Sequence, residues 1–119
     1  MAGARRRRLS RSAEFDRVYR EGRSHAGRHL VLYFFPREGD DEPPRLGLSV
    51  GRKVGGAVER NKVKRLLREA FGTLAERLPD DQDVVVVARP EVRELAEREG
   101  LEGVSAALAE LVEKAGFAA

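Results

Sequence analysis

Cysteine and tryptophan are both missing from the 119 residues of this chain, and methionine occurs once. Without cysteine, the chain forms neither disulfides nor thiolate zinc sites. It has no run of about eighteen apolar residues, so we expect no membrane-spanning helix. The basic N-terminus is not followed by an apolar stretch, so we expect no secretory signal. Together these features favour a cytoplasmic protein.

Catalytic and metal-binding signatures are scarce as well. His25 and His29 have no HExxH motif around them, and we expect them in a loop or at the surface. Asp40 and Asp41 lie between prolines, where a hairpin tip is a better explanation than a metal site. The glycine-rich segment 51–56 lacks the GK[ST] ending of a nucleotide-binding loop. We therefore expect neither catalytic nor metal-ligating residues.

Charge is abundant but unevenly distributed. Residues 45–68 hold eight basic residues and one acid, whereas residues 69–119 hold five basic residues and twelve acids. Residues 1–11 form a separate basic arm that we expect to be loose. Such sorting favours a folded protein with one side that faces a polyanion, bound in a salt-dependent way.

The most informative segment is residues 59–71. Its apolar residues, with one just beyond, recur at helical spacing and predict a buried stripe: Val63, Leu66, Leu67, Ala70, Phe71 and Leu74. The neighbouring arc carries Arg60, Asn61, Lys64, Arg65 and Arg68. Cations this close repel one another, so an anionic partner explains them best. A membrane surface is the weaker alternative, because the helix lacks the aromatic edge of an interfacial helix.

A glycine- and cation-rich loop, residues 51–56, precedes this helix and contains Arg52 and Lys53. Backbone N–H groups and the helix dipole favour an anion at a helix N-terminus, so we interpret the loop as a site for a nucleic-acid phosphate. Aromatic residues are few. Phe15, Tyr19 and Tyr33 are either core residues or, if exposed beside cations, a stacking surface for unpaired bases.

Local patterns predict the element order α-β-β-α-β-α in one domain, residues 1–119. The helices of this order are expected over 13–21, 57–78 and 102–115, and the strands over 29–35, 45–50 and 83–89. Residues 91–99 are a candidate for an additional short helix before the last one. The first two strands are expected to pair antiparallel across an acidic loop. The third is rich in β-branched residues and suits the centre of a sheet. This pattern indicates an α+β fold, with helices against one small sheet.

Residues 60–71 resemble the conserved helix of the bacterial ribonuclease P protein component, whose signature is Arg-Asn-Arg. The resemblance extends to segments 15–22, 46–58 and 85–90, and covers roughly residues 8–115. The chain departs from the family at Lys62, where many members have the second arginine of the signature. It also has Gly56 in place of a common asparagine.

The resemblance implies a two-layer α/β sandwich of order αβββαβα, similar to the second domain of a small-subunit ribosomal protein. The helix lies in a left-handed βαβ crossover. The family has three early strands. We expect the third near residues 45–52, with 29–35 and the neighbourhood of Arg37 supplying the others.

The resemblance also implies the function. Ribonuclease P is an endoribonuclease that removes the 5′ leader of precursor tRNA, and its RNA subunit carries the active site and requires Mg²⁺. The protein binds that RNA and the leader, broadens substrate use and requires no protein partner. Carried over, the residues that contact the catalytic RNA are Arg52, Lys53, Arg60, Asn61, Lys62, Lys64, Arg65 and Arg68. The leader-binding cleft is lined by Phe15, Tyr19 and Tyr33.

Two other functions remain open. A structural or assembly protein of the ribosome with the same fold would sediment with ribosomes and leave tRNA maturation unchanged. A stand-alone nuclease would use acidic residues such as Asp40 and Asp41 and would cleave RNA without a partner.

Overall fold

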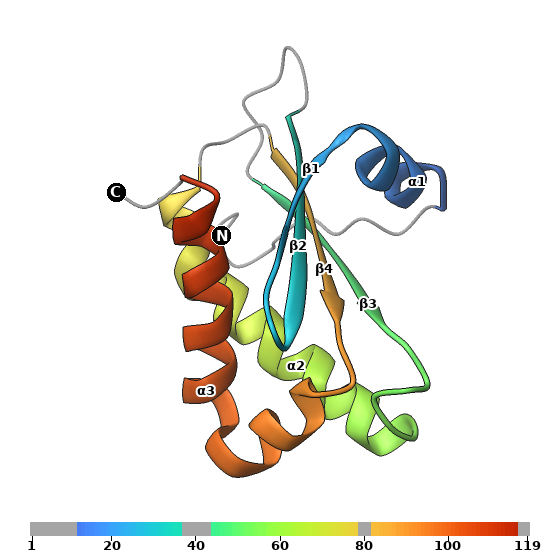
Figure 1. The fold of residues 1–119 in the computed structure, drawn as a ribbon, viewed down its shortest axis with the longest axis vertical. Coiled ribbons are helices and arrows are strands. Elements are labelled where there is room, and N and C mark those ends of the chain that lie inside the picture. Colours follow the sequence, from blue (N-terminus) through green and yellow to red (C-terminus); the bar gives the residue numbers. More distant parts are fainter. Residues whose placement is uncertain (1–11, 37–43, 79–81, 117–119) are drawn as a thin grey trace, which may run out of the picture.

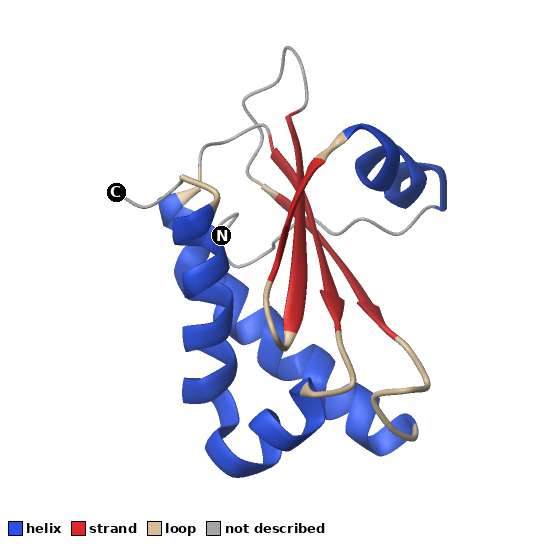
Figure 2. Ribbon diagram, in the orientation of Figure 1, coloured by secondary structure: helices blue, strands red, loops and turns tan. Residues whose placement is uncertain are grey.

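The computed structural model of the chain describes residues 12–36, 44–78 and 82–116. Its elements follow the order αβββαβα (Figure 1 and Figure 2). They are α1 (Ser12–Glu21), β1 (Arg23–Ala26), β2 (Leu30–Pro36), β3 (Arg45–Val50), α2 (Ala57–Leu74), β4 (Gln82–Ala88) and α3 (Val92–Lys114). The basic arm, the neighbourhood of Arg37, and Asp40 and Asp41 lie outside the described residues.

Four strands form one mixed sheet in the order β1-β2-β4-β3. β2 pairs antiparallel with β1 and with β4, and β3 pairs parallel with β4. The central position of β4 confirms the prediction for that strand. The expected antiparallel pairing between strands 29–35 and 45–50 is wrong, because β4 lies between them. A strand that is buried on both faces is best placed with a neighbour on each side, and six of the seven residues of β4 are buried.

The strand expected near residues 45–52 is β3, and the one expected over 29–35 is β2. The expectation of a strand around Arg37 lies outside the described residues, and the strand that completes the three is β1, which was not predicted. β1 has only four residues, Arg-Ser-His-Ala, and three of them are exposed. A polar edge strand of this length has no apolar alternation that could reveal it. It is held by its pairing with β2 and by the turn between them, where the N–H of Gly27 donates to the carbonyl of Leu30 at 2.8 Å.

The two faces of the sheet are covered differently. One face, with Leu32, Val84 and Val86, packs against α2 and α3 in the main core. The other face carries a smaller cluster around Val18 of α1 and Val85 of β4. The two-layer arrangement therefore describes the sheet with α2 and α3, and α1 adds partial cover on the opposite side, apart from the other helices (Figure 1).

The helices agree with prediction except in two respects. α2 ends at Leu74 rather than at residue 78, because the chain tightens there into a 3-10 turn, Ala75–Arg77. The two helices expected over 91–99 and 102–115 form a single element, α3, which bends at Gly100 with φ 58°. Glycine adopts this left-handed conformation at little cost, so the helix resumes after the bend. No helix among the described residues is both long enough and apolar enough to span a bilayer.

Candidate nucleic-acid interface

Helix α2 separates its apolar residues from its cations. All six residues predicted for the apolar stripe are buried, from Val63 to Leu74. The polar residues of the neighbouring arc, called here the cationic arc, are Arg60, Asn61, Lys64, Arg65 and Arg68. Three of them are exposed, and Arg60 and Lys64 are half-buried. At about 100° per residue these five share one side of the helix, so the fold presents them together.

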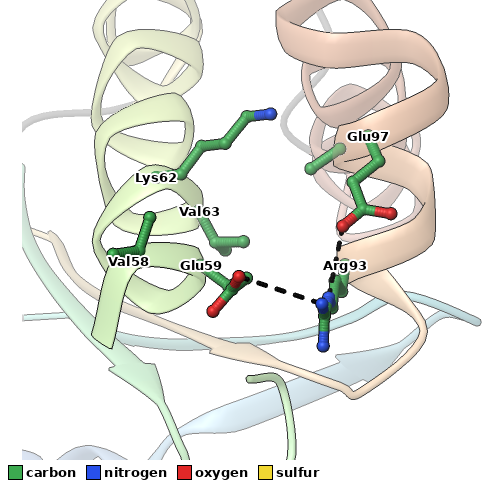
Figure 3. Close-up of a pocket in the computed structure, with 7 residues that line it drawn as sticks. Val58, Glu59, Lys62, Val63, Arg93 and Glu97 are labelled. Atoms are coloured by element: carbon green, nitrogen blue, oxygen red, sulfur yellow. Dashed lines mark hydrogen bonds and ion pairs between the residues drawn. The ribbon is translucent and has the colours of Figure 1, made fainter. Parts of the chain in front are cut away.

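Lys62 lies on another side of α2, about 200° around the helix from Arg60. It lines a cavity of about 180 Å³ between α2 and α3 together with Val58, Glu59, Val63, Arg93, Ala96 and Glu97 (Figure 3). In the close-up its amine points away from Arg93. The structure therefore separates Lys62 from the cationic arc, and its contact with RNA stays a prediction.

Arg52 and Lys53 stand in the turn that joins β3 to α2, and both are exposed. Val54, with 2% of its surface exposed, anchors the turn in the main core. Its N–H donates to the carbonyl of Gly51 at 3.1 Å, and the N–H of Gly55 donates to the carbonyl of Arg52 at 3.2 Å. This turn fixes two further cations close in sequence to the first turn of α2.

The N-terminus of α2 is already occupied by a carboxylate of the helix itself, that of Glu59. The carboxylate of Glu59 accepts a hydrogen bond from the N–H of Gly56 at 3.1 Å. A carboxylate here is favoured by the helix dipole and by the free N–H groups of the first turn. The phosphate site expected on the glycine loop therefore loses one donor to Glu59. Arg52 and Lys53 supply the cationic side chains of that region.

The three aromatic residues predicted for a leader cleft lie together where α1 covers the sheet. The ring centroid of Tyr19 is 6.2 Å from that of Phe15 and 4.9 Å from that of Tyr33. Tyr19 is 39% exposed, whereas Phe15 and Tyr33 are half-buried against the smaller cluster. Gly22 lets α1 end close to the sheet, since a Cβ there would lie 2.4 Å from the carbonyl oxygen of Phe34. The aromatic group is thus partly core and partly accessible.

Two neighbours of this aromatic group were missed by the sequence analysis. The guanidinium of Arg17 lies 4.5 Å from the ring centroid of Phe35, which is within cation–π range. Ser49 forms a side-chain hydrogen bond with Tyr19. Ser49 comes near Tyr19 only because β3 pairs with β4, and no local sequence pattern encodes that strand order.

Burial raises the pKa of Tyr19 above its ordinary value of 10.0, and the hydrogen bond with Ser49 opposes part of this rise. The folded protein therefore holds the phenolic proton more tightly than the unfolded chain. We expect this contribution to stability to be complete below pH 10 and to be lost as the pH rises through the raised pKa.

The chain has two tyrosines, so Tyr33→Phe leaves Tyr19 as the only phenol. An ultraviolet titration of that variant should show phenolate formation with a midpoint above 10.0 in the folded state, and at the ordinary value in denaturant. A folded-state midpoint at or below 10.0 would contradict the burial of the Tyr19 phenol.

The two histidines are not brought together with other potential ligands. His25 lies in β1, with its ring centroid 6.2 Å from that of Phe34. His29 precedes β2, and its carbonyl accepts a hydrogen bond from the N–H of Arg89 at 2.9 Å. Within residues 12–36, 44–78 and 82–116, no three histidine, aspartate or glutamate side chains gather as metal ligands would.

Comparison with known proteins decides the family. The family model described as Ribonuclease P matches residues 4–115 of this chain. The chain belongs to the ribonuclease P protein family. It is the protein subunit of ribonuclease P, the enzyme that processes the 5′ end of precursor tRNA, and so part of an endoribonuclease holoenzyme. Membership of the family implies association with the ribonuclease P RNA.

Individual relatives agree in sequence and in fold. The ribonuclease P protein component of Shouchella clausii (strain KSM-K16) is 48% identical over 92 residues, which are 77% of this chain and 75% of that protein. The solved RNase P protein of Staphylococcus aureus superposes with a TM-score of 0.84 at 30% identity, covering 97% of this chain and all of that one. For the Thermotoga maritima protein the TM-score is 0.79 at 33% identity, with 92% and 97% covered.

Proposed function

We propose that the cationic arc, with Arg52 and Lys53, binds the RNA subunit of ribonuclease P. The placement of the arc is the observation that supports this most. α3 packs beside α2 on the side of Glu59 and Lys62, and α3 carries six exposed glutamates. The cationic arc lies on a different side of α2 from the one that faces α3 and its glutamates. An RNA that approaches the arc therefore meets cations and is kept from the glutamates of α3.

The side chains of the arc suit contacts to a folded RNA backbone. Arginine offers a planar fork of donors that matches a phosphate, and lysine offers a point charge. Such contacts set the position of an RNA without reading its bases. Lys62 is included in the proposed RNA surface as a separate contact, since it extends from another side of α2.

We further propose that Phe15, Tyr19 and Tyr33 receive nucleotides of the 5′ leader. The leader is single-stranded, and unpaired bases stack on exposed aromatic rings beside cations. Tyr19 has the accessible ring, and Arg17 brings a cation to the same surface. Phe15 and Tyr33 are half-buried, so they hold the surface around Tyr19 in a fixed arrangement.

Replacing Phe15 with alanine should weaken binding of precursor tRNA with a leader about 5- to 10-fold, the lower end of the about 1–3 kcal/mol that base stacking on one aromatic ring is worth, because Phe15 is half-buried. Binding of mature tRNA, which has no leader, should change much less. Fluorescence titrations of the holoenzyme with the two RNAs test this, after circular dichroism has shown that the variant is folded. Equal losses on both RNAs would leave Phe15 with a packing role only.

The chemistry of cleavage is assigned to the RNA subunit with its Mg²⁺ ions. The protein contributes affinity and helps substrate and metal binding, and no residue of this chain is proposed as catalytic.

The proposal also takes residues 1–119 as one domain that works in the cytoplasm, where precursor tRNA is processed. We propose a left-handed crossover for β3–α2–β4, supported by the family resemblance and by the parallel pairing of β3 with β4.

Cleavage of a precursor tRNA at low millimolar Mg²⁺ tests the proposed division of labour. The protein alone, the ribonuclease P RNA of the same organism alone, and the two together are compared. We expect strong cleavage at the mature 5′ end only in the mixture. Cleavage by the protein alone would reject the assignment of catalysis to RNA. A mixture no faster than the RNA alone would reject the assisting role.

A further inference from the structure

The first turns of α2 and α3 meet at one end of the sheet. β3 and β4 run parallel, and their last residues, Val50 and Ala88, are partners in the register. The chain segments that follow the two strands therefore leave the sheet at the same end, where both strands finish, and each leads into a helix (Figure 1). This geometry brings Arg93, at the start of α3, beside the first turn of the RNA-binding helix.

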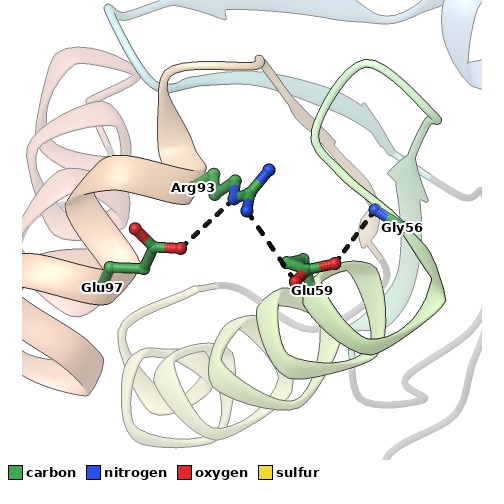
Figure 4. A network of polar contacts seen from close by, with 4 residues as sticks. All are labelled: Gly56, Glu59, Arg93 and Glu97. Carbon is green, nitrogen blue, oxygen red and sulfur yellow. Dashed lines mark hydrogen bonds and ion pairs between the residues drawn. The ribbon is translucent and has the colours of Figure 1, made fainter.

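A chain of polar contacts links the two helices there (Figure 4). The N–H of Gly56 donates to one carboxylate oxygen of Glu59 at 3.1 Å. The other oxygen of Glu59 lies 3.8 Å from the guanidinium of Arg93. Arg93 Nε donates to the carboxylate of Glu97 at 3.2 Å, so Arg93 is held by its own helix as well. Glu59 is thus fixed both from the loop and from α3.

Glu59 replaces a side-chain cap that this sequence lacks. Gly56 is the N-cap of α2 in an extended conformation, and glycine has no side chain to accept an N–H of the first turn. The loop instead closes tightly over Glu59: a Cβ on Gly55 would lie 2.8 Å from the Cβ of Glu59. The first turn of α2, which carries Arg60 and leads into Asn61, therefore depends on the position of this carboxylate.

Glu59 is also the one acid among the eight cations of residues 45–68. Left unpaired, its carboxylate would compete with RNA phosphates for the neighbouring arginines. Arg93 holds it on the side of α2 that faces α3, away from the cationic arc. In Figure 3 the Glu59 and Glu97 carboxylates both point toward Arg93, while Lys62 points elsewhere.

We propose that Arg93 is a positioning residue for RNA binding, acting through Glu59 on the first turn of α2. This inference rests on the proposed RNA-binding role of the cationic arc. Arg93 need not touch RNA in this role. It sets where the carboxylate of Glu59 lies, and so fixes the backbone that orients Arg60 and the turn with Arg52 and Lys53.

The experiment compares Arg93→Ala with Arg98→Ala in the full chain. Arg98 is a matched control, because it is an exposed arginine of the same helix whose ion pairs within the described residues both lie in α3, with Glu94 at 3.6 Å and Glu99 at 3.4 Å. Both variants lose one positive charge. We expect Arg93→Ala to bind the ribonuclease P RNA about 3- to 5-fold more weakly than Arg98→Ala, the size expected of a weakened cap.

Two further measurements separate positioning from charge. Amide exchange of Arg60, whose N–H donates to the carbonyl of Gly56 at 2.9 Å, should accelerate in Arg93→Ala without RNA and stay unchanged in Arg98→Ala. Adding Gly56→Asn to Arg93→Ala supplies a side-chain cap at an extended backbone conformation, and the Glu59 carboxylate, whose Oε1 would lie 3.2 Å from the new Cβ, shifts slightly to admit it. We expect it to restore the affinity to within about 2-fold of the unmodified protein.

Equal losses for Arg93→Ala and Arg98→Ala would overturn the proposal, as would unchanged exchange at Arg60. Failure of the RNA-binding role itself looks different. In that case removal of the cationic arc would leave the affinity for RNA unchanged, and an effect of Arg93 on RNA binding through the arc would be rejected as well. Faster exchange at Arg60 would still support the positioning of the turn by Arg93.

Discussion

Simultaneous replacement of Arg60, Arg65 and Arg68 with alanine should lower the affinity for ribonuclease P RNA on the order of 100-fold near 0.1 M salt, because each neutralised phosphate releases condensed counterions. The slope of log affinity against log salt concentration should become less negative by about 2 to 3. Each phosphate that the variant no longer neutralises accounts for one unit or slightly less. Filter binding over a series of salt concentrations measures both quantities.

A control with the same change in charge removes Arg77, Arg98 and Lys114. These cations contact groups of this chain near α3: Arg77 pairs with Glu113, and Lys114 contacts the carbonyl of Ala26. We expect that control to change affinity much less and to keep the salt slope. Equal slopes for the arc variant and the unmodified protein would reject phosphate contact by the cationic arc.

The second large effect is expected at Asp83, in the central strand. Its carboxylate accepts two hydrogen bonds from Arg45, at 2.7 and 2.8 Å, and its side chain is 2% exposed. Arg45 and Asp83 are also register partners between β3 and β4. Asp83→Ala leaves the guanidinium of Arg45 in a largely dry site, so we expect a loss of about 3–5 kcal/mol in the free energy of unfolding.

Urea denaturation followed by circular dichroism measures this loss. Replacing both partners, as in Arg45→Met with Asp83→Leu, should cost far less than Asp83→Ala alone, because both charged groups of the buried pair are then replaced by apolar ones. If the single and the double replacement cost the same, the pair contributes nothing as a pair, and the stability of this edge comes from apolar packing.

Sequence patterns predicted the elements that bury a long apolar stripe and missed what depends on distant pairing. Helix α2 was predicted with all six of its buried residues, since 3.6-residue periodicity is encoded locally. Strand β4 was recognised as central because its run of β-branched residues is also visible in the local sequence. Strand β1 was missed, because a short polar edge strand leaves no local pattern. The predicted partner of β3 was wrong, because a parallel pairing across an intervening helix leaves none either.

The candidate site divides in the same way. The cationic arc follows from helical spacing, and the structure keeps its five residues on one side of α2. The separation of Lys62, the pairing of Glu59 with Arg93 and the contact of Ser49 with Tyr19 arise from how α3 and β3 are placed. These contacts join residues far apart in the chain, so only the assembled fold reveals them.

The position of β4 between β2 and β3 has a consequence for synthesis of the protein. Translation proceeds from the N-terminus, so β2, β3 and the basic helix emerge before the strand that joins them. Until residues 82–88 have left the ribosome, β3 has no sheet partner and the apolar stripe of α2 has only part of its core. Contacts this distant in sequence form late and slowly. A nascent chain that ends before β4 therefore carries its cations without the scaffold that arranges them, so we expect the proposed RNA binding to begin only after residues 82–88 have been translated.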